Sequence, residues 1–138
     1  MNIKHTCLML VAFCTLLTGH ATFAAPTESQ DAFFQQLSSL CGARYTGQAS
    51  YPDDPGDAFR GKVLVAHFET CYEDEIRIPF NVGDDHSRTW VVRRVDGGLQ
   101  LQLDHRHAVG TPEEVSLYGG STQKAGSPLA QSFPADAY

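Results

Sequence analysis

Basic residues are scarce in this 138-residue chain. Ten lysines and arginines stand against 16 aspartates and glutamates, which gives a formal net charge of −6. Binding to nucleic acid or to an anionic membrane surface requires a basic face that attracts phosphate groups. The composition therefore predicts no nucleic-acid partner and no electrostatic attachment to lipid.

The sequence also lacks the motifs of several common catalytic sites. It contains no Walker phosphate loop, no glycine fingerprint for dinucleotides, no GxSxG nucleophile elbow and no HExxH zinc motif. None of its four cysteines belongs to a CxxC pair, which argues against a structural zinc site. These absences favour a protein without a cofactor and without catalytic machinery of its own.

Long apolar runs are lacking as well, and the one clear run lies near the N-terminus at residues 8–17. It is shorter than the roughly 18–20 apolar residues that a membrane-spanning helix needs. Lys4 precedes it, and the small residues Thr22 and Ala24 follow it, as in a cleavable secretory signal peptide. We predict that residues 1–24 are a leader cut after Ala24. The mature chain is then periplasmic or secreted, without a transmembrane span.

Removal of the leader changes both the charge and the cysteine count. Lys4 leaves with it, so the mature chain has 9 basic and 16 acidic residues and a net charge of −7. Cys7 and Cys14 are also lost, and only Cys41 and Cys71 remain. Two cysteines in an oxidising compartment tend to pair. We therefore predict a Cys41–Cys71 disulfide, whose loop of about 30 residues would contribute about 3.7 kcal/mol in a chain-entropy model.

The apolar pattern predicts one helix followed by strands. Apolar residues recur at helical spacing over 33–41, with Ser29 or Asp31 as the candidate N-cap and Gly42 as the end. Alternating patterns and turn residues then predict strands at 43–50, 63–68, 75–82, 88–95, 99–107 and 115–118.

Two local signals refine this prediction. Pro79 cannot donate a ladder hydrogen bond, so a bulge or a free edge is expected there. Asp96-Gly97-Gly98 is typical of a tight hairpin turn. The expected fold class is mainly β, an antiparallel up-and-down meander of five or six strands with one N-terminal amphipathic helix. The meander forms an open or partial barrel over 25–118, and 119–138 is a tail or loop rich in glycine, serine and proline.

The candidate site lies at the end of the strand over 99–107. Alternation places His105 and His107 on the face that carries the leucines of that strand. A two-residue turn at the preceding hairpin would add Arg88 and Trp90 to the same face. A three-residue turn would shift the register and send Trp90 to the opposite face.

Three interpretations of these residues remain open. The histidines can be structural, or Arg88, Trp90, His105 and His107 can line a small-ligand pocket. His105 and His107 can instead bind a metal that His67 or a carboxylate completes, as in a metal-dependent hydrolase. The favoured function is a non-catalytic β domain that binds a small molecule or an envelope protein. A hydrolase and a purely structural envelope protein are the alternatives.

Several sequence blocks resemble a family of uncharacterised secreted proteins of Gram-negative bacteria. The resemblance is densest between Cys71 and Gly120. The blocks are Leu40-Cys41-Gly42, Glu73-Asp74-Glu75-Ile76-Arg77-Ile78-Pro79-Phe80, Val82-Gly83-Asp84-Asp85, Ser87-Arg88-Thr89-Trp90, Asp104-His105-Arg106-His107, Tyr118-Gly119-Gly120 and Phe133-Pro134-Ala135-Asp136.

The resemblance implies a structural expectation rather than an activity. Members of the family continue into further strands beyond the last of these blocks, whereas this chain stops at Tyr138. The resemblance therefore implies a shortened copy with an exposed sheet edge, apolar residues beside that edge, and self-association through it.

Overall fold

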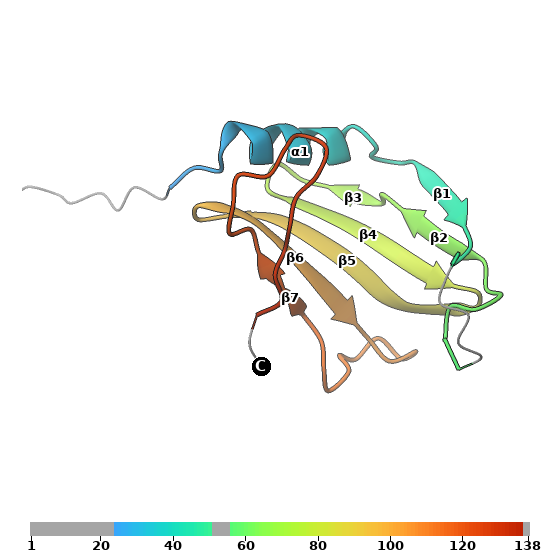
Figure 1. Ribbon diagram of the computed structural model, residues 1–138. Helices are drawn as coiled ribbons and strands as arrows, with labels where there is room; N and C mark the ends of the chain where they lie inside the picture. The colour runs from blue at the N-terminus through green and yellow to red at the C-terminus, as the bar shows by residue number, and fades with distance from the viewer. Residues whose placement is uncertain (1–23, 51–55, 137–138) are drawn as a thin grey trace, which may run out of the picture.

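The computed structural model describes residues 24–50 and 56–136, and it shows one helix lying against one open antiparallel sheet (Figure 1). The helix is α1 (Glu28–Ser38). The strands are β1 (Arg44–Gly47), β2 (Leu64–His67), β3 (Thr70–Cys71), β4 (Glu75–Val82), β5 (Asp85–Val95), β6 (Gly98–His105) and β7 (Tyr118–Ser121). Their order is β1-β2-β4-β5-β6-β7, and the short β3 pairs with β4 beyond the end of β2.

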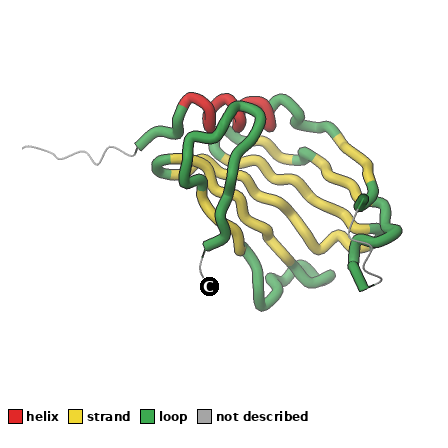
Figure 2. Tube along the Cα trace, in the orientation of Figure 1, coloured by secondary structure: helices red, strands yellow, loops and turns green. Residues whose placement is uncertain are grey.

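This arrangement confirms the predicted fold class, with seven strands instead of five or six. All pairs are antiparallel, and consecutive long strands are neighbours, as in a meander (Figure 2). The unexpected strand is β3, a two-residue segment too short to leave a periodic pattern in the sequence. No helix in the described ranges is long and apolar enough to cross a membrane. The predicted leader lies outside these ranges except for Ala24.

The helix begins earlier than the sequence analysis placed it. Its N-cap is Thr27, neither Ser29 nor Asp31. Thr27 and Gln30 form a reciprocal capping box, in which the Thr27 amide donates to Gln30 Oε1 at 2.8 Å and the Gln30 amide donates to Thr27 Oγ1 at 3.3 Å. The helix ends before Gly42, which takes its positive φ of 85° in the turn that follows.

The core lies between α1 and the sheet. Phe34 of the helix is 1% exposed and packs with Ile76, Val92 and Leu99, and more peripheral apolar residues of α1 surround this cluster. Burial of these side chains is the main reason that the helix lies on this face. The Cys41–Cys71 disulfide is present, with a Cα–Cα distance of 6.1 Å, so it joins the turn after α1 to β3.

Strand β4 has the predicted bounds, and the sheet accommodates its proline at a break. On one side of β4, pairing with β2 ends at Ala66 opposite Phe80, and pairing with β3 begins at Thr70 opposite Arg77. Pro79 falls in the gap between these two short strands. On the other side, the register with β5 shifts just after Phe80. The missing amide of Pro79 is thus located where the ladder is already interrupted.

The β5–β6 hairpin has the two-residue turn that places Arg88 on the same face as the leucines of β6. Val95 pairs with Gly98 across a turn made by Asp96 and Gly97, and Gly97 has a φ of 76°. The same register sets Arg88 directly opposite His105.

Every predicted strand except β4 differs from the prediction at one or both bounds: β1 and β2 are shorter than 43–50 and 63–68, and β6 begins at Gly98 rather than 99. β5 begins at Asp85 rather than 88, β6 ends at His105 rather than 107, and the last strand lies at Tyr118–Ser121 rather than at 115–118. Gly120 pairs with Leu101 of β6 in this last strand, and a long-range contact requires glycine there: a Cβ atom would lie 1.7 Å from the Pro134 carbonyl oxygen. Residues 119–121, which the sequence analysis assigns to the tail, therefore belong to the sheet.

The segment after β7 packs on the helix and is anchored by two glutamine side chains (Figure 1). The Gln30 side-chain amide donates to the Lys124 carbonyl at 3.1 Å and to Thr122 Oγ1 at 2.9 Å. The Gln36 amide donates to the Pro128 carbonyl at 2.9 Å. This segment thus covers part of the helix, instead of meandering freely as its composition indicates.

The sheet is open and has β1 and β7 as its edge strands. All four residues of β1 are exposed, and the Tyr45 side chain beside this edge is 51% exposed. The edge of β7 is partly covered, because the Asp136 amide donates to the Gly119 carbonyl at 2.7 Å. Self-association through an edge stays a prediction.

Candidate functional site

Two of the four predicted site residues meet at the end of the sheet that points away from α1 (Figure 1). Arg88 and His105 face each other on β5 and β6, and Ser87 bridges them. Ser87 Oγ lies 3.1 Å from His105 Nε2 and 3.3 Å from Arg88 Nη1. The paired register therefore positions a guanidinium and an imidazole around one hydroxyl.

Asp85 completes this cluster, and the sequence analysis missed it together with Ser87. The Ser87 amide donates to Asp85 Oδ1 at 2.9 Å, and the Arg88 guanidinium pairs with Oδ2. Hydrogen bonds from the Ser87 hydroxyl, the Arg88 guanidinium and the Ser87 amide hold the pKa of Asp85 well below its usual range. The sequence signal was an Asp followed two residues later by Ser, a spacing that favours this local bond.

The lowered pKa of Asp85 predicts a pH-dependent contribution to stability. A depressed carboxyl pKa stabilises the folded state above the unfolded pKa of about 4 and loses this contribution as the pH falls further. At pH 7 we expect Asp85→Asn to lower the melting temperature by about 3 °C, because the ion pair is partly exposed. The difference from wild type should shrink steadily as the pH falls from about 4 toward 2 in thermal unfolding followed by circular dichroism. A difference that is constant over this pH range would contradict the assignment.

Trp90 does not line the site. It pairs with Leu103 further along the hairpin and packs against the core beneath α1. The aromatic ring that contacts the cluster is Phe59, whose centroid lies 5.9 Å from the Arg88 guanidinium carbon. The expected stacking wall is therefore absent at Trp90, because the register that sets Arg88 opposite His105 places the indole two pairs further along the hairpin, toward the core.

His107 lies past the end of β6, in a tight turn. The His107 amide donates to the Thr111 carbonyl at 2.9 Å, and the Gly110 amide donates back to the His107 carbonyl at 2.8 Å. The imidazole Nδ1 lies 2.9 Å from Glu113 Oε1. The His107 side chain thus pairs with Glu113, whereas that of His105 contacts Ser87. His107 lines a pocket that His105 does not line.

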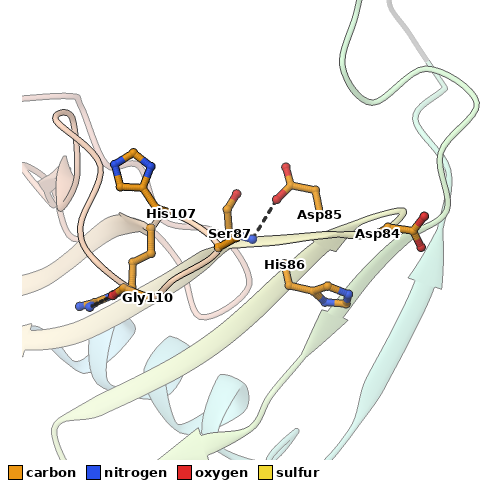
Figure 3. A pocket seen from close by; sticks show the side chains of 8 residues that line it. Asp84, Asp85, His86, Ser87, His107 and Gly110 are labelled. Atoms are coloured by element: carbon orange, nitrogen blue, oxygen red, sulfur yellow. Dashed lines mark hydrogen bonds between the residues drawn. The ribbon is translucent and has the colours of Figure 1, made fainter.

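This pocket lies between the β4–β5 turn and the turn after β6, and its volume is about 510 Å³ (Figure 3). Asp85 and Ser87 point to one side of the chain and His86 to the other, while His107 stands across from them. The lining residues are Asp84, Asp85, His86, Ser87, Arg106, His107, Ala108 and Gly110. The site that the structure forms thus shares only His107 with the predicted ligand set.

Hydrogen bonds hold the far wall of the pocket in place. Arg106 donates from Nε to both carboxylate oxygens of Asp104 at 3.0 Å and from Nη1 to the Gly110 carbonyl at 3.0 Å. In contrast, the side chains of Asp84 and His86 make no hydrogen bond or ion pair with any residue of the described ranges. The pocket therefore combines a preformed wall with two exposed polar side chains that no residue of the described ranges engages.

The metal interpretation of His105 and His107 gains no support from the geometry. Within 24–50 and 56–136, no group of three or more His, Cys, Asp or Glu side chains is placed to hold a metal ion. His105 is bound to Ser87 and His107 to Glu113. On β2, Nδ1 of His67 lies 3.7 Å from Oε1 of Glu69. The three histidines thus face three different local partners.

The Ser87–His105 contact has the atoms of a nucleophile and its base, and the Ser87 hydroxyl is shared with a third group. Arg88 Nη1 donates to the Ser87 oxygen at 3.3 Å, and the same guanidinium pairs with Asp85. These contacts link the ends of β5 and β6 beside the pocket.

Comparisons with protein-family models, with curated proteins and with solved structures found no match. The geometry alone thus defines the class of site, a small polar pocket at the open end of a disulfide-linked β-meander.

Proposed function

We propose that this protein is a non-catalytic binding domain that takes a small polar molecule in the pocket between the β4–β5 turn and the turn after β6. The observation that carries the proposal is the pairing of this preformed pocket with two polar side chains, His86 and Asp84, that make no bond within the described chain. Polar groups of this kind are the ones that orient a bound ligand.

The size and composition of the pocket support this proposal. A volume of about 510 Å³ lies within the range of roughly 300–1,000 Å³ that small-molecule sites occupy. Arg106 and His107 contribute further donors, and each is held by a partner that fixes its direction. A ligand therefore meets groups that are already oriented, which reduces the entropy lost on binding.

The location that we propose is the periplasm or the extracellular medium. The Cys41–Cys71 disulfide is typical of proteins in such oxidising compartments. The proposal includes removal of the leader after Ala24 and membership of the secreted Gram-negative family that the sequence blocks resemble. Neither the hydrolase nor the purely structural alternative is favoured by a particular contact in the described residues.

A fragment screen tests the proposed pocket. ¹⁵N-labelled protein is titrated with amino acids, monosaccharides, dicarboxylates and nucleosides, and binding is followed by chemical-shift changes. We expect at least one compound class to shift the amide signals of 84–87 and 106–110. His86→Ala removes an imidazole that lines the pocket, so it should weaken binding of that compound at least fivefold. The fold should be unaffected, because no described residue bonds to this side chain.

The matched control is His67→Gln, a histidine change on β2 that leaves the pocket intact. Its affinity for the same compound should equal that of wild type. Shifts spread over the whole sheet, or equal weakening by both variants, would contradict binding in the pocket. A screen that shifts none of the pocket amides would overturn the proposal.

A further inference from the structure

The residue just before α1 is docked on the β5–β6 hairpin turn. The Ala24 amide donates to Asp96 Oδ1 at 2.5 Å, and the Gly97 amide donates to the Ala24 carbonyl at 2.7 Å. Figure 1 shows this segment passing close to the hairpin turn on its way into the helix. The turn at Asp96 and Gly97 therefore joins β5 to β6 and also binds Ala24, which lies just before the helix.

This docked residue adjoins the bond at which the proposed leader is cut. Hydrolysis of the Ala24–Ala25 bond by a leader peptidase consumes one water and leaves a carboxylate on Ala24 and an α-ammonium on Ala25. Both contacts of Ala24 with the turn are then lost. The Asp96 carboxylate then no longer accepts a hydrogen bond from the Ala24 amide. The new α-ammonium group of Ala25 lies one residue further along the chain, a step of about 3.8 Å.

We propose that Asp96 binds the α-ammonium group of Ala25 in the processed protein, and this inference rests on the proposed export and cut. An ammonium forms shorter and stronger hydrogen bonds to a carboxylate than an uncharged amide does. Of the two acidic residues in the first turn of α1, Asp31 already pairs with Arg94 and Glu28 lies three residues after Ala25, whereas Asp96 already accepts from the backbone amide of the residue just before Ala25.

The position of the helix makes this contact useful. The first turn of α1 carries a partial positive charge, which disfavours an ammonium three residues before its first residue. The Asp96 carboxylate offsets that repulsion and ties the mature end to the β5–β6 turn.

The experiment uses the full chain, exported with its own leader in a Gram-negative host and purified as the processed protein. N-terminal sequencing should give Ala25 as the first residue. Asp96→Asn keeps the turn, because Asn-Gly is a preferred hairpin pair. It should lower the melting temperature by about 2–4 °C, as loss of an exposed ion pair does in a domain of this size. The α-amino group, followed by ¹⁵N-alanine NMR, should titrate at lower pH in this variant.

Two controls separate the inference from a role of Asp96 in the turn alone. Acetylation of the α-amino group removes its charge, so Asp96→Asn should have no further effect on acetylated protein. Asp84→Asn, a change at a carboxylate without a partner in the described chain, should alter neither observable. An effect of Asp96→Asn that survives acetylation, or an unchanged α-amino titration, would overturn the inference while leaving the cut intact. A first residue other than Ala25 would overturn the cut itself, and the inference with it.

Discussion

Replacing Cys41 and Cys71 together with serine is expected to lower the free energy of unfolding by about 3.7 kcal/mol. The two cysteines are 30 residues apart, and the bond restricts the unfolded chain by closing that loop. In the folded state it joins the turn after α1 to β3, a two-residue strand with few ladder bonds of its own. Urea unfolding of the wild type and the double variant, followed by tryptophan fluorescence, measures the difference.

Reduced wild-type protein is the control for this prediction. Its unfolding midpoint should match that of the double variant, because both lack the covalent link and differ only by sulfur-to-oxygen replacement. The amide signals of the pocket should stay unchanged in the variant, since the pocket lies at the end of the sheet away from α1. A loss below about 1 kcal/mol would show that the helix packing alone fixes this part of the fold.

The disulfide and strand β4 were predictable because each depends on a local or countable feature. After removal of the leader, only Cys41 and Cys71 can pair. Strand β4 alternates cleanly, so its bounds follow from the sequence alone. The hairpin sequence left two registers open, and the structure has the two-residue turn, in which Val95 pairs with Gly98.

The misplaced elements depend on contacts between distant parts of the chain. Gly120 looks like a strand breaker, yet it pairs with Leu101 as part of β7, where the Pro134 carbonyl leaves no room for a Cβ atom. The N-cap is an exception, because the capping box of Thr27 and Gln30 depends only on a three-residue spacing that the sequence contains.

The candidate site was predictable only in part, for a similar reason. The opposition of Arg88 and His105 follows from strand alternation and register. The pocket itself is formed by two turns, and turn conformations depend on local bonds such as that of the Ser87 amide to Asp85. Alternation extended past His105 placed His107 beside it, whereas the strand ends there and His107 turns toward Glu113.

Asp104→Ala is expected to destabilise the protein by about 3 kcal/mol. Asp104 is only 3% exposed and lies on the sheet face opposite α1. Its carboxylate accepts hydrogen bonds from Arg77 Nη2 at 2.9 Å, Arg106 Nε at 3.0 Å and Ser116 Oγ at 3.3 Å. It thereby joins β4, the end of β6 and the connection to β7, and urea unfolding measures what this junction contributes.

The expected loss stays at the low end of the range for a broken buried ion pair, because the arginines keep other partners. Arg77 retains Glu75 at 3.2 Å, and Arg106 is half-exposed and retains the Gly110 carbonyl. Asp104→Asn should fall between alanine and wild type, since it keeps the volume but loses the charge. Asp84→Ala, which removes a carboxylate without a partner in the described chain, should change the stability by less than about 0.5 kcal/mol.

Asp104 also connects the stability of the sheet to the proposed pocket. Arg106 lines the pocket, and its guanidinium is aimed by Asp104 on one side and by Gly110 on the other. In Asp104→Asn, studied below its melting temperature, we therefore expect a pocket ligand to bind several-fold more weakly although no lining residue has changed. Unaltered affinity in this folded variant would mean that the Gly110 carbonyl alone sets the wall of the pocket.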